Sequence, residues 1–211
     1  MKKNKLQIGK DLEVERFIYG ITRQIWESKQ INSIYDYYNE DVIVRSPRNI
    51  TYKCKDVIDS TKDTLSQFPD RQLIGEDVIW SGDCKNGILS SHRILSTATH
   101  KGNGFYGKTT EKSIIYRVIA DCFIIDNKVV EEWIVRDESA ILNQLGLTTK
   151  TFVKIKIKEK IFNRSSLDSI SNAFDYKNII KSNSNEFTET YISYFKKLID
   201  KNFNLIKNKY E

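Results

Sequence analysis

Hydrophobic residues recur at helical spacing through the first third of the chain. Residues 11–29 place apolar side chains three or four positions apart, which predicts an amphipathic helix capped by Asp11. Similar spacing predicts a short helix over about 32–39 and a longer one over 54–68. Between these two helices, residues 41–45 are mostly β-branched and predict a short strand.

After Pro69 the apolar period becomes that of β-strands. Four stretches rich in β-branched and aromatic residues follow, over 71–81, 87–100, 113–126 and 128–136. Gly and Asn residues at their joins are typical of turns between antiparallel strands. The shortest join, Asp126-Asn127-Lys128, predicts that the last two strands form a hairpin. A short helix over 137–145 closes the series.

This order of elements predicts the fold class. Helices followed by a long antiparallel meander indicate an α+β fold rather than repeated βαβ units. We expect a cone-shaped, strongly curved antiparallel sheet with the N-terminal helices packed in its hollow, plus a helical C-terminal extension. Such a cone would enclose a pocket in the middle of the domain.

Composition narrows the class of protein. The chain has 211 residues, of which 39% are hydrophobic and 29% charged, as in soluble globular proteins. No apolar run approaches the roughly 18 residues of a transmembrane helix, and no apolar segment of a signal peptide follows the basic N-terminus. The three widely spaced cysteines fit neither a disulfide framework nor a metal site. We therefore expect a cytoplasmic protein with no membrane contact and no metal.

The net charge of +6 is unevenly distributed. Residues 1–149 are electrically balanced, and the whole basic excess lies in residues 150–211. A basic stripe on a folded face would indicate nucleic-acid binding, whereas a tail rich in Lys and Asn beside a neutral body favours solubility alone. We do not expect a nucleic-acid partner.

Six short motifs occur in a fixed order along the strand-rich region. They are Trp80–Asp83, Ser90–Arg93, Thr99–Gly107, Arg117–Asp121, Glu131–Asp137 and Asn143–Gly146. Together with the order of elements, they resemble the SnoaL-like polyketide cyclases, or ester cyclases, of the nuclear transport factor 2-like superfamily. The resemblance covers residues 11–149.

The resemblance implies a function as well as a fold. It implies a cofactor-independent enzyme that acts on a small apolar carbonyl compound by acid–base catalysis, as a cyclase, isomerase or hydratase. It also implies a homodimer, because members of the superfamily often pair through sheet faces. The alternative is a non-catalytic module that binds a small ligand or another protein, because one fold hosts both classes.

In the resembling family the Glu-x-Trp face of the last strand lines the pocket. This implies a site containing Glu131, Trp133 and Asp137, which share one face if the strand has no bulge. A poorly hydrated carboxylate beside an indole would have a raised pKa, which suits proton transfer. The alternative is that Glu131 and Asp137 bond backbone groups or arginines at the sheet end.

The family also uses an acidic residue as general base with a histidine nearby. The closest match is Asp121, the one acid in an apolar strand, with His92, which can relay a proton near neutral pH. Arg117 shares the face of Asp121 and is a candidate substrate-binding residue. The alternatives are a structural histidine and a salt bridge from Asp121 to Arg93 or Arg117.

Aromatic residues are candidates for the wall of the pocket. Trp26, Tyr38, Trp80 and Tyr106 could contact a flat apolar ligand, although a plain core would explain the same pattern. Residues 102–107 match the spacing GxGxxG, but they lie between two strands and no helix follows. Dinucleotide binding is therefore not expected.

We expect four segments along the chain. They are an N-terminal tail over 1–10, the SnoaL-like domain over 11–149, a linker with short helices over 150–185 and a C-terminal helix over 186–211. Residues 190–211 echo 18–39, with Lys201, Asn204 and Tyr210 at the places of Lys29, Asn32 and Tyr38. The last segment is either the beginning of a truncated second module or a chance similarity between two amphipathic helices.

Overall fold

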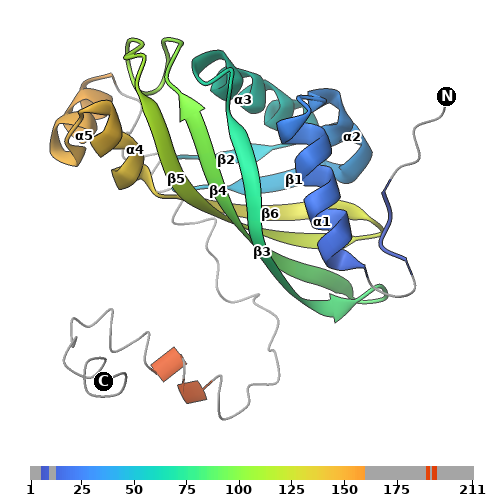
Figure 1. The fold of residues 1–211 in the computed structure, drawn as a ribbon. Helices are drawn as coiled ribbons and strands as arrows, with labels where there is room; N and C mark the ends of the chain where they lie inside the picture. The colour runs from blue at the N-terminus through green and yellow to red at the C-terminus, as the bar shows by residue number, and fades with distance from the viewer. Residues whose placement is uncertain (1–5, 10–12, 160–188, 191, 194–211) are drawn as a thin grey trace. The chain divides into compact units, whose positions relative to one another are not determined.

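A computed structural model describes residues 6–9, 13–159, 189–190 and 192–193 (Figure 1). The chain divides into two compact units, Met1–Ile170 and Ser171–Glu211. Every helix and strand with a label in Figure 1 belongs to the first unit. The predicted cap at Asp11 and nearly all of the predicted C-terminal helix and its sequence echo lie outside the described residues.

The helices and strands alternate largely as the sequence predicts. The helical elements are α1 (Val14–Thr22), a π-helical turn (Arg23–Glu27), a 3₁₀ turn (Ile31–Ser33), α2 (Ile34–Tyr37), α3 (Cys54–Gln67), α4 (Glu138–Leu145) and α5 (Thr149–Lys158). The strands are β1 (Tyr38–Arg45), β2 (Ile50–Tyr52), β3 (Gln72–Asp83), β4 (Gly87–Thr99), β5 (Ser113–Ile125) and β6 (Lys128–Arg136). The three-residue strand β2 was not predicted, because it is too short to show a period.

The six strands form one sheet in the order β2-β1-β6-β5-β4-β3. Strongly curved and unclosed, the sheet carries α1 and α3 on the same side (Figure 1). The predicted hairpin between β5 and β6 is confirmed, and its turn residues Asp126 and Asn127 both have positive φ, as a type I′ turn requires. The expectation of a purely antiparallel sheet is wrong at one place, because β1 pairs with β6 in parallel.

Burial alternates along β4 and β5 and defines two faces of the sheet. Even-numbered residues such as His92, Ile94 and Ala120 are buried on the inner face, beneath the helices. The outer face carries apolar side chains that are exposed in the single chain: Ile79, Leu89, Ile115, Ile119 and Val135. Apolar side chains therefore occur on both faces, and on the outer face they alternate with charged ones such as Arg93 and Arg117.

Candidate functional site

A cavity of about 870 Å³ lies against the inner face of the sheet. Its walls are mixed. Apolar side chains include Ile94, Val118, Ala120 and Ile134 from the sheet, Val57 from α3 and Trp26 from the π-helical turn, and α3 adds polar ones such as Thr61 and Gln67. The turn between β1 and β2 and the loop residues Asn103–Tyr106 complete the lining. This volume suits a small organic molecule.

Glu132 is the acidic group on the inner face of β6 within this cavity. Glu132 is only 6% exposed, and the Tyr38 hydroxyl donates a hydrogen bond to its Oε2 atom at 3.1 Å. Burial raises the pKa of Glu132 to about 7, although the hydrogen bond from Tyr38 opposes this effect. A carboxyl group in this state can both accept and return a proton near neutral pH.

Two arginines also line the cavity. Arg71 is buried, and its Nε donates to the Ser96 hydroxyl at 3.4 Å. Arg136 is half-buried on β6, and burial lowers the pKa of its guanidinium, as do the positive charges of Arg71 and Arg48. Within the described part of the chain, no carboxylate lies within ion-pair distance of Arg71 or Arg136.

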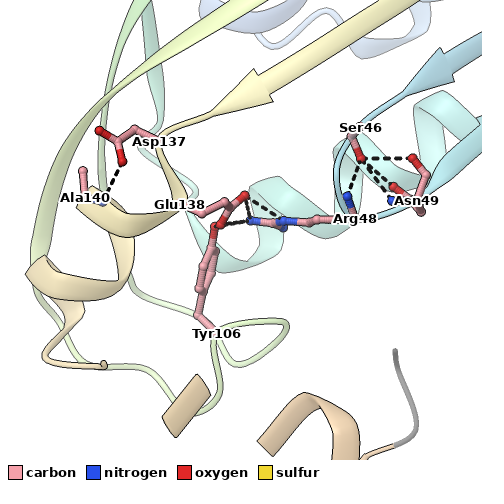
Figure 2. A network of polar contacts seen from close by, with 7 residues as sticks. All are labelled: Ser46, Arg48, Asn49, Tyr106, Asp137, Glu138 and Ala140. Carbon is pink, nitrogen blue, oxygen red and sulfur yellow. Dashed lines mark hydrogen bonds and ion pairs between the residues drawn. The ribbon is translucent and has the colours of Figure 1, made fainter. Parts of the chain in front are cut away.

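A third arginine in the lining, Arg48, is neutralised by Glu138. Arg48 Nε and Nη2 donate to the two carboxylate oxygens of Glu138 at 2.8 Å each. The Tyr106 hydroxyl donates to the same carboxylate at 2.8 Å, so that the three side chains meet at Glu138 (Figure 2). Arg48 also lies 4.0 Å above the ring of Phe105. This network ties the β1–β2 turn and the loop around Tyr106 to the start of α4.

Asp137 lies outside the cavity lining and has a helix-capping position. It is exposed, and its Oδ1 atom accepts a hydrogen bond from the backbone N–H of Ala140 at 2.9 Å (Figure 2). Asp137 is therefore the N-cap of α4. This arrangement matches the structural alternative considered for this residue.

The capping geometry gives a measurable expectation for Asp137→Ala. Loss of an N-cap carboxylate leaves a helix N–H without its partner, which costs about 1 kcal/mol in the free energy of unfolding. Urea unfolding of the variant should show this loss, and Asp137→Asn should recover most of it. A variant that unfolds like the wild type and has lost only catalytic activity would contradict the capping role.

His92 and Asp121 lie on opposite faces of the sheet. His92 pairs with Ala120 and Asp121 pairs with Ser91, and successive residues of a strand point to opposite sides. The His92 ring packs beneath α1 against Tyr19, with ring centroids 5.3 Å apart, and burial lowers its pKa to about 4. The structure therefore does not bring together the pair that the resemblance implied.

The prediction that Glu131 and Trp133 of β6 face the pocket is wrong. A bulge between Val129 and Glu131 changes the alternation, so that Val129 and Glu132 both face inward. Glu131 and Trp133 consequently lie on the other side, where Glu131 forms an ion pair with Arg45 at 2.6 Å.

Two further predicted residues lie away from the cavity. Arg117 is on the outer face and forms an ion pair with Glu76 at 2.9 Å. Trp80 is 36% exposed near the end of β3 and is not part of the lining.

Three predicted aromatic residues do lie at the site. Trp26 and Tyr106 line the cavity, and Tyr38 holds Glu132. Sequence reasoning missed Glu132, Arg71 and Arg136. Glu132 and Arg136 are even-numbered, whereas the face predicted to line the pocket consisted of odd-numbered residues. Knowledge of the bulge in β6 would therefore have identified both.

The described residues show neither a metal site nor a membrane-spanning helix. No group of three or more His, Cys, Asp and Glu side chains in these ranges is placed to hold a metal ion. No helix among the same residues is long and apolar enough to cross a membrane.

Comparisons with known proteins agree with this architecture. IdmH of Streptomyces antibioticus, a candidate polyketide cyclase, is 18% identical with a TM-score of 0.55, covering 64% of this chain and 99% of IdmH. AclR of Streptomyces galilaeus, a candidate hydroxylase, is 24% identical with a TM-score of 0.53, covering 63% and 85%. A Catenulispora acidiphila protein of ketosteroid isomerase-like fold is 11% identical with a TM-score of 0.51, covering 62% and 92%.

These similarities establish the fold, and together with the family they support an enzyme-like role on a small molecule. A search of curated proteins found no match. The sequence profile of the SnoaL-like polyketide cyclases matches residues 16–145, which contain the sheet and the cavity. The chain therefore belongs to the SnoaL-like polyketide cyclase family.

Proposed function

We propose that this protein is a cofactor-independent enzyme that removes a proton next to a carbonyl group of a small, largely apolar compound. The observation that carries the proposal is the position of Glu132, whose buried carboxyl has a pKa of about 7 and faces an open cavity with apolar side chains on its sheet wall. An open cavity with a desolvated carboxyl supports an enzyme over a binding module. We therefore place the base at Glu132 rather than at Asp121 or Asp137.

The proposed reaction begins with the ionised form of Glu132. Its carboxylate takes a proton from the carbon next to the carbonyl, and the electron pair moves onto the carbonyl oxygen to form an enolate. The Tyr38 hydroxyl fixes one carboxylate oxygen, which leaves the other to face the substrate. In ring closure the enolate carbon then attacks a second carbonyl of the substrate, and the alkoxide that forms takes the proton back from Glu132. In isomerisation the enolate takes the proton back from Glu132 at another position.

Proton abstraction can be tested without knowing the natural substrate. A panel of small aromatic and alicyclic β-dicarbonyl compounds is incubated with the protein in D₂O, and ¹H NMR follows the loss of the α-proton signal. We expect at least one compound to exchange faster with the protein than in buffer alone. Exchange at the buffer rate across the whole panel would contradict the proposal.

We also propose that a second copy of the chain covers the outer face of the sheet. This face carries the exposed apolar residues Ile79, Ile115, Ile119 and Val135, of which Ile119 and Val135 are paired across β5 and β6, and apolar side chains gathered on one face mark an interaction surface. Light scattering should give about twice the chain mass of 24.7 kDa, and Ile119→Lys should shift the protein to the monomer. A clean 24.7 kDa species for the wild type at micromolar concentration would contradict the dimer.

A further inference from the structure

The charged residues that line the cavity are Arg48, Arg71, Arg136, Glu132 and Asp63, of which Asp63 is exposed on α3. Arg48 is offset by Glu138, with which it shares two hydrogen bonds. Arg71 and Arg136 are left with no ion pair among the described residues. The remaining buried acid of the lining, Glu132, is on the same strand face as Arg136 but bonds Tyr38 instead.

It is costly to keep two guanidinium groups with no ion pair among the described residues beside the apolar side chains that the sheet contributes to the cavity. Burial disfavours each positive charge, and the two charges also repel each other, which lowers the pKa of Arg136. An anionic ligand would offset both effects. Arginine is also the side chain whose planar donor fork fits a carboxylate with two parallel hydrogen bonds.

We infer that Arg136 and Arg71 bind a carboxylate group of the substrate. This inference rests on the proposed function, and it refines the substrate class to an apolar carbonyl compound that carries one carboxylate. One negative charge fits the site better than two, because ionised Glu132 already supplies one negative charge against the two arginines. Ser96, which accepts the hydrogen bond from Arg71, orients that side chain as a positioning residue.

The spacing along β6 restricts the shape of the substrate. Glu132 and Arg136 are four residues apart on one face, which corresponds to about 13 Å between their Cα atoms. Ile134 lies between them, with Ala120 and Val118 of β5 alongside. The carboxylate and the acidic C–H bond are therefore expected at opposite ends of the ligand, with an apolar middle portion over Ile134.

A matched pair of ligands tests this inference by isothermal titration calorimetry. The probes are 2-naphthoate and its neutral counterpart 2-naphthamide, which differ little in shape. We expect the wild type to bind the carboxylate about 10- to 100-fold more tightly, because hydrogen bonds to charged groups are stronger than those to neutral ones. In Arg136→Gln and Arg71→Gln this preference should fall to about threefold or less.

Internal controls separate a lost contact from a lost fold. Binding of 2-naphthamide should be retained in both Gln variants, and Arg117→Gln, which alters an arginine of the outer face, should keep the full preference. If a Gln variant does not fold, Arg136→Lys replaces it in the test. Lysine keeps the positive charge but lacks the planar pair of donors, so this variant should show an intermediate preference for 2-naphthoate over 2-naphthamide.

Several results would overturn the inference. They are equal binding of the two probes by the wild type, no binding of either, and a full preference that survives in Arg136→Gln. Displacement of 2-naphthoate by inorganic phosphate at comparable concentration would also overturn the assignment to a carboxylate. Glu132→Gln should keep the preference for 2-naphthoate, so that a failure of proton abstraction and a failure of carboxylate binding are distinguishable.

Discussion

Replacing Glu132 with Gln is expected to lower the rate of α-proton exchange by about 10²- to 10⁴-fold, the usual contribution of a positioned general base. The amide has nearly the same size as the carboxyl group and can still accept the hydrogen bond from Tyr38. The variant therefore removes the base with little change in packing. Exchange rates measured by ¹H NMR under saturating ligand give the comparison directly.

The neighbouring glutamate provides a matched control. Glu131 is one position earlier on the same strand, but it is outside the cavity and paired with Arg45. Glu131→Gln should keep an exchange rate close to that of the wild type. A larger loss in Glu131→Gln than in Glu132→Gln would show that the bulge assigns the wrong face, and the proposed base would have to be abandoned.

The pH dependence of the exchange rate identifies the same group independently. Only the ionised carboxylate can take a proton, so the rate should rise with pH and level off above about 7, the pKa of Glu132. The hydrogen bond from Tyr38 lowers the pKa of Glu132, so Tyr38→Phe should move this inflection to higher pH. An inflection that stays in place in Tyr38→Phe would mean that another group controls the profile.

The order of the longer elements was predictable from the sequence because local signals mark their boundaries. The turn at Asp126-Asn127 adopts the two positive φ angles that Asn and Asp tolerate, and this fixes the pairing of β5 with β6. Gly146 ends α4 in the left-handed conformation, in agreement with the predicted end of that helix.

The candidate site was less predictable because its residues depend on which way each strand faces. Ile79, Ile119 and Val135 place apolar side chains on the outer face as well, so the period of the pattern alone does not say which face is inside. The bulge after Val129 then reverses the second half of β6. Glu131, which was expected to line the pocket, and Glu132, which does line it, are neighbours, and the one extra residue of the bulge decides which of them faces the cavity.

Arg71 and Arg136 illustrate a second limit. They are 65 positions apart in the sequence. Arg71 directly precedes β3 and Arg136 is the last residue of β6, and an arginine at the end of a strand is ordinarily solvated. Their shared position follows from the curvature of the sheet, which directs the end of β6 and the residue before β3 toward one cavity. The local sequence around either residue does not predict that curvature.

Glu132 and His92 are expected to affect the pH dependence of stability in opposite directions. The folded state holds the proton on Glu132 up to a pH of about 7, whereas an ordinary glutamate loses it near 4.5. Between these pH values the folded state binds the extra proton, so the free energy of unfolding falls as pH rises. Across the full interval the loss is about 3 kcal/mol.

His92 has the reverse effect. Its pKa is about 4 in the folded protein against the ordinary value of 6.5, so between these values the unfolded state binds the extra proton. The free energy of unfolding therefore rises with pH across this interval, again by about 3 kcal/mol. From about pH 4.5 to 6.5 the two contributions cancel, and they leave little net slope in the wild type.

Single substitutions should reveal the two opposing effects of pH on the free energy of unfolding. In Glu132→Gln the free energy of unfolding should rise with pH relative to the wild type, by about 3 kcal/mol between pH 4.5 and 7. In His92→Gln the free energy of unfolding should fall relative to the wild type as pH rises from 4 to 6.5. In the double variant it should change with pH nearly as in the wild type from about pH 4.5 to 6.5. Urea unfolding followed by circular dichroism at half-unit pH steps measures these differences, in which all other titrating groups cancel. Single variants that run parallel to the wild type would mean that neither group is buried as the cavity and α1 place them, since desolvation is the cause of both shifts.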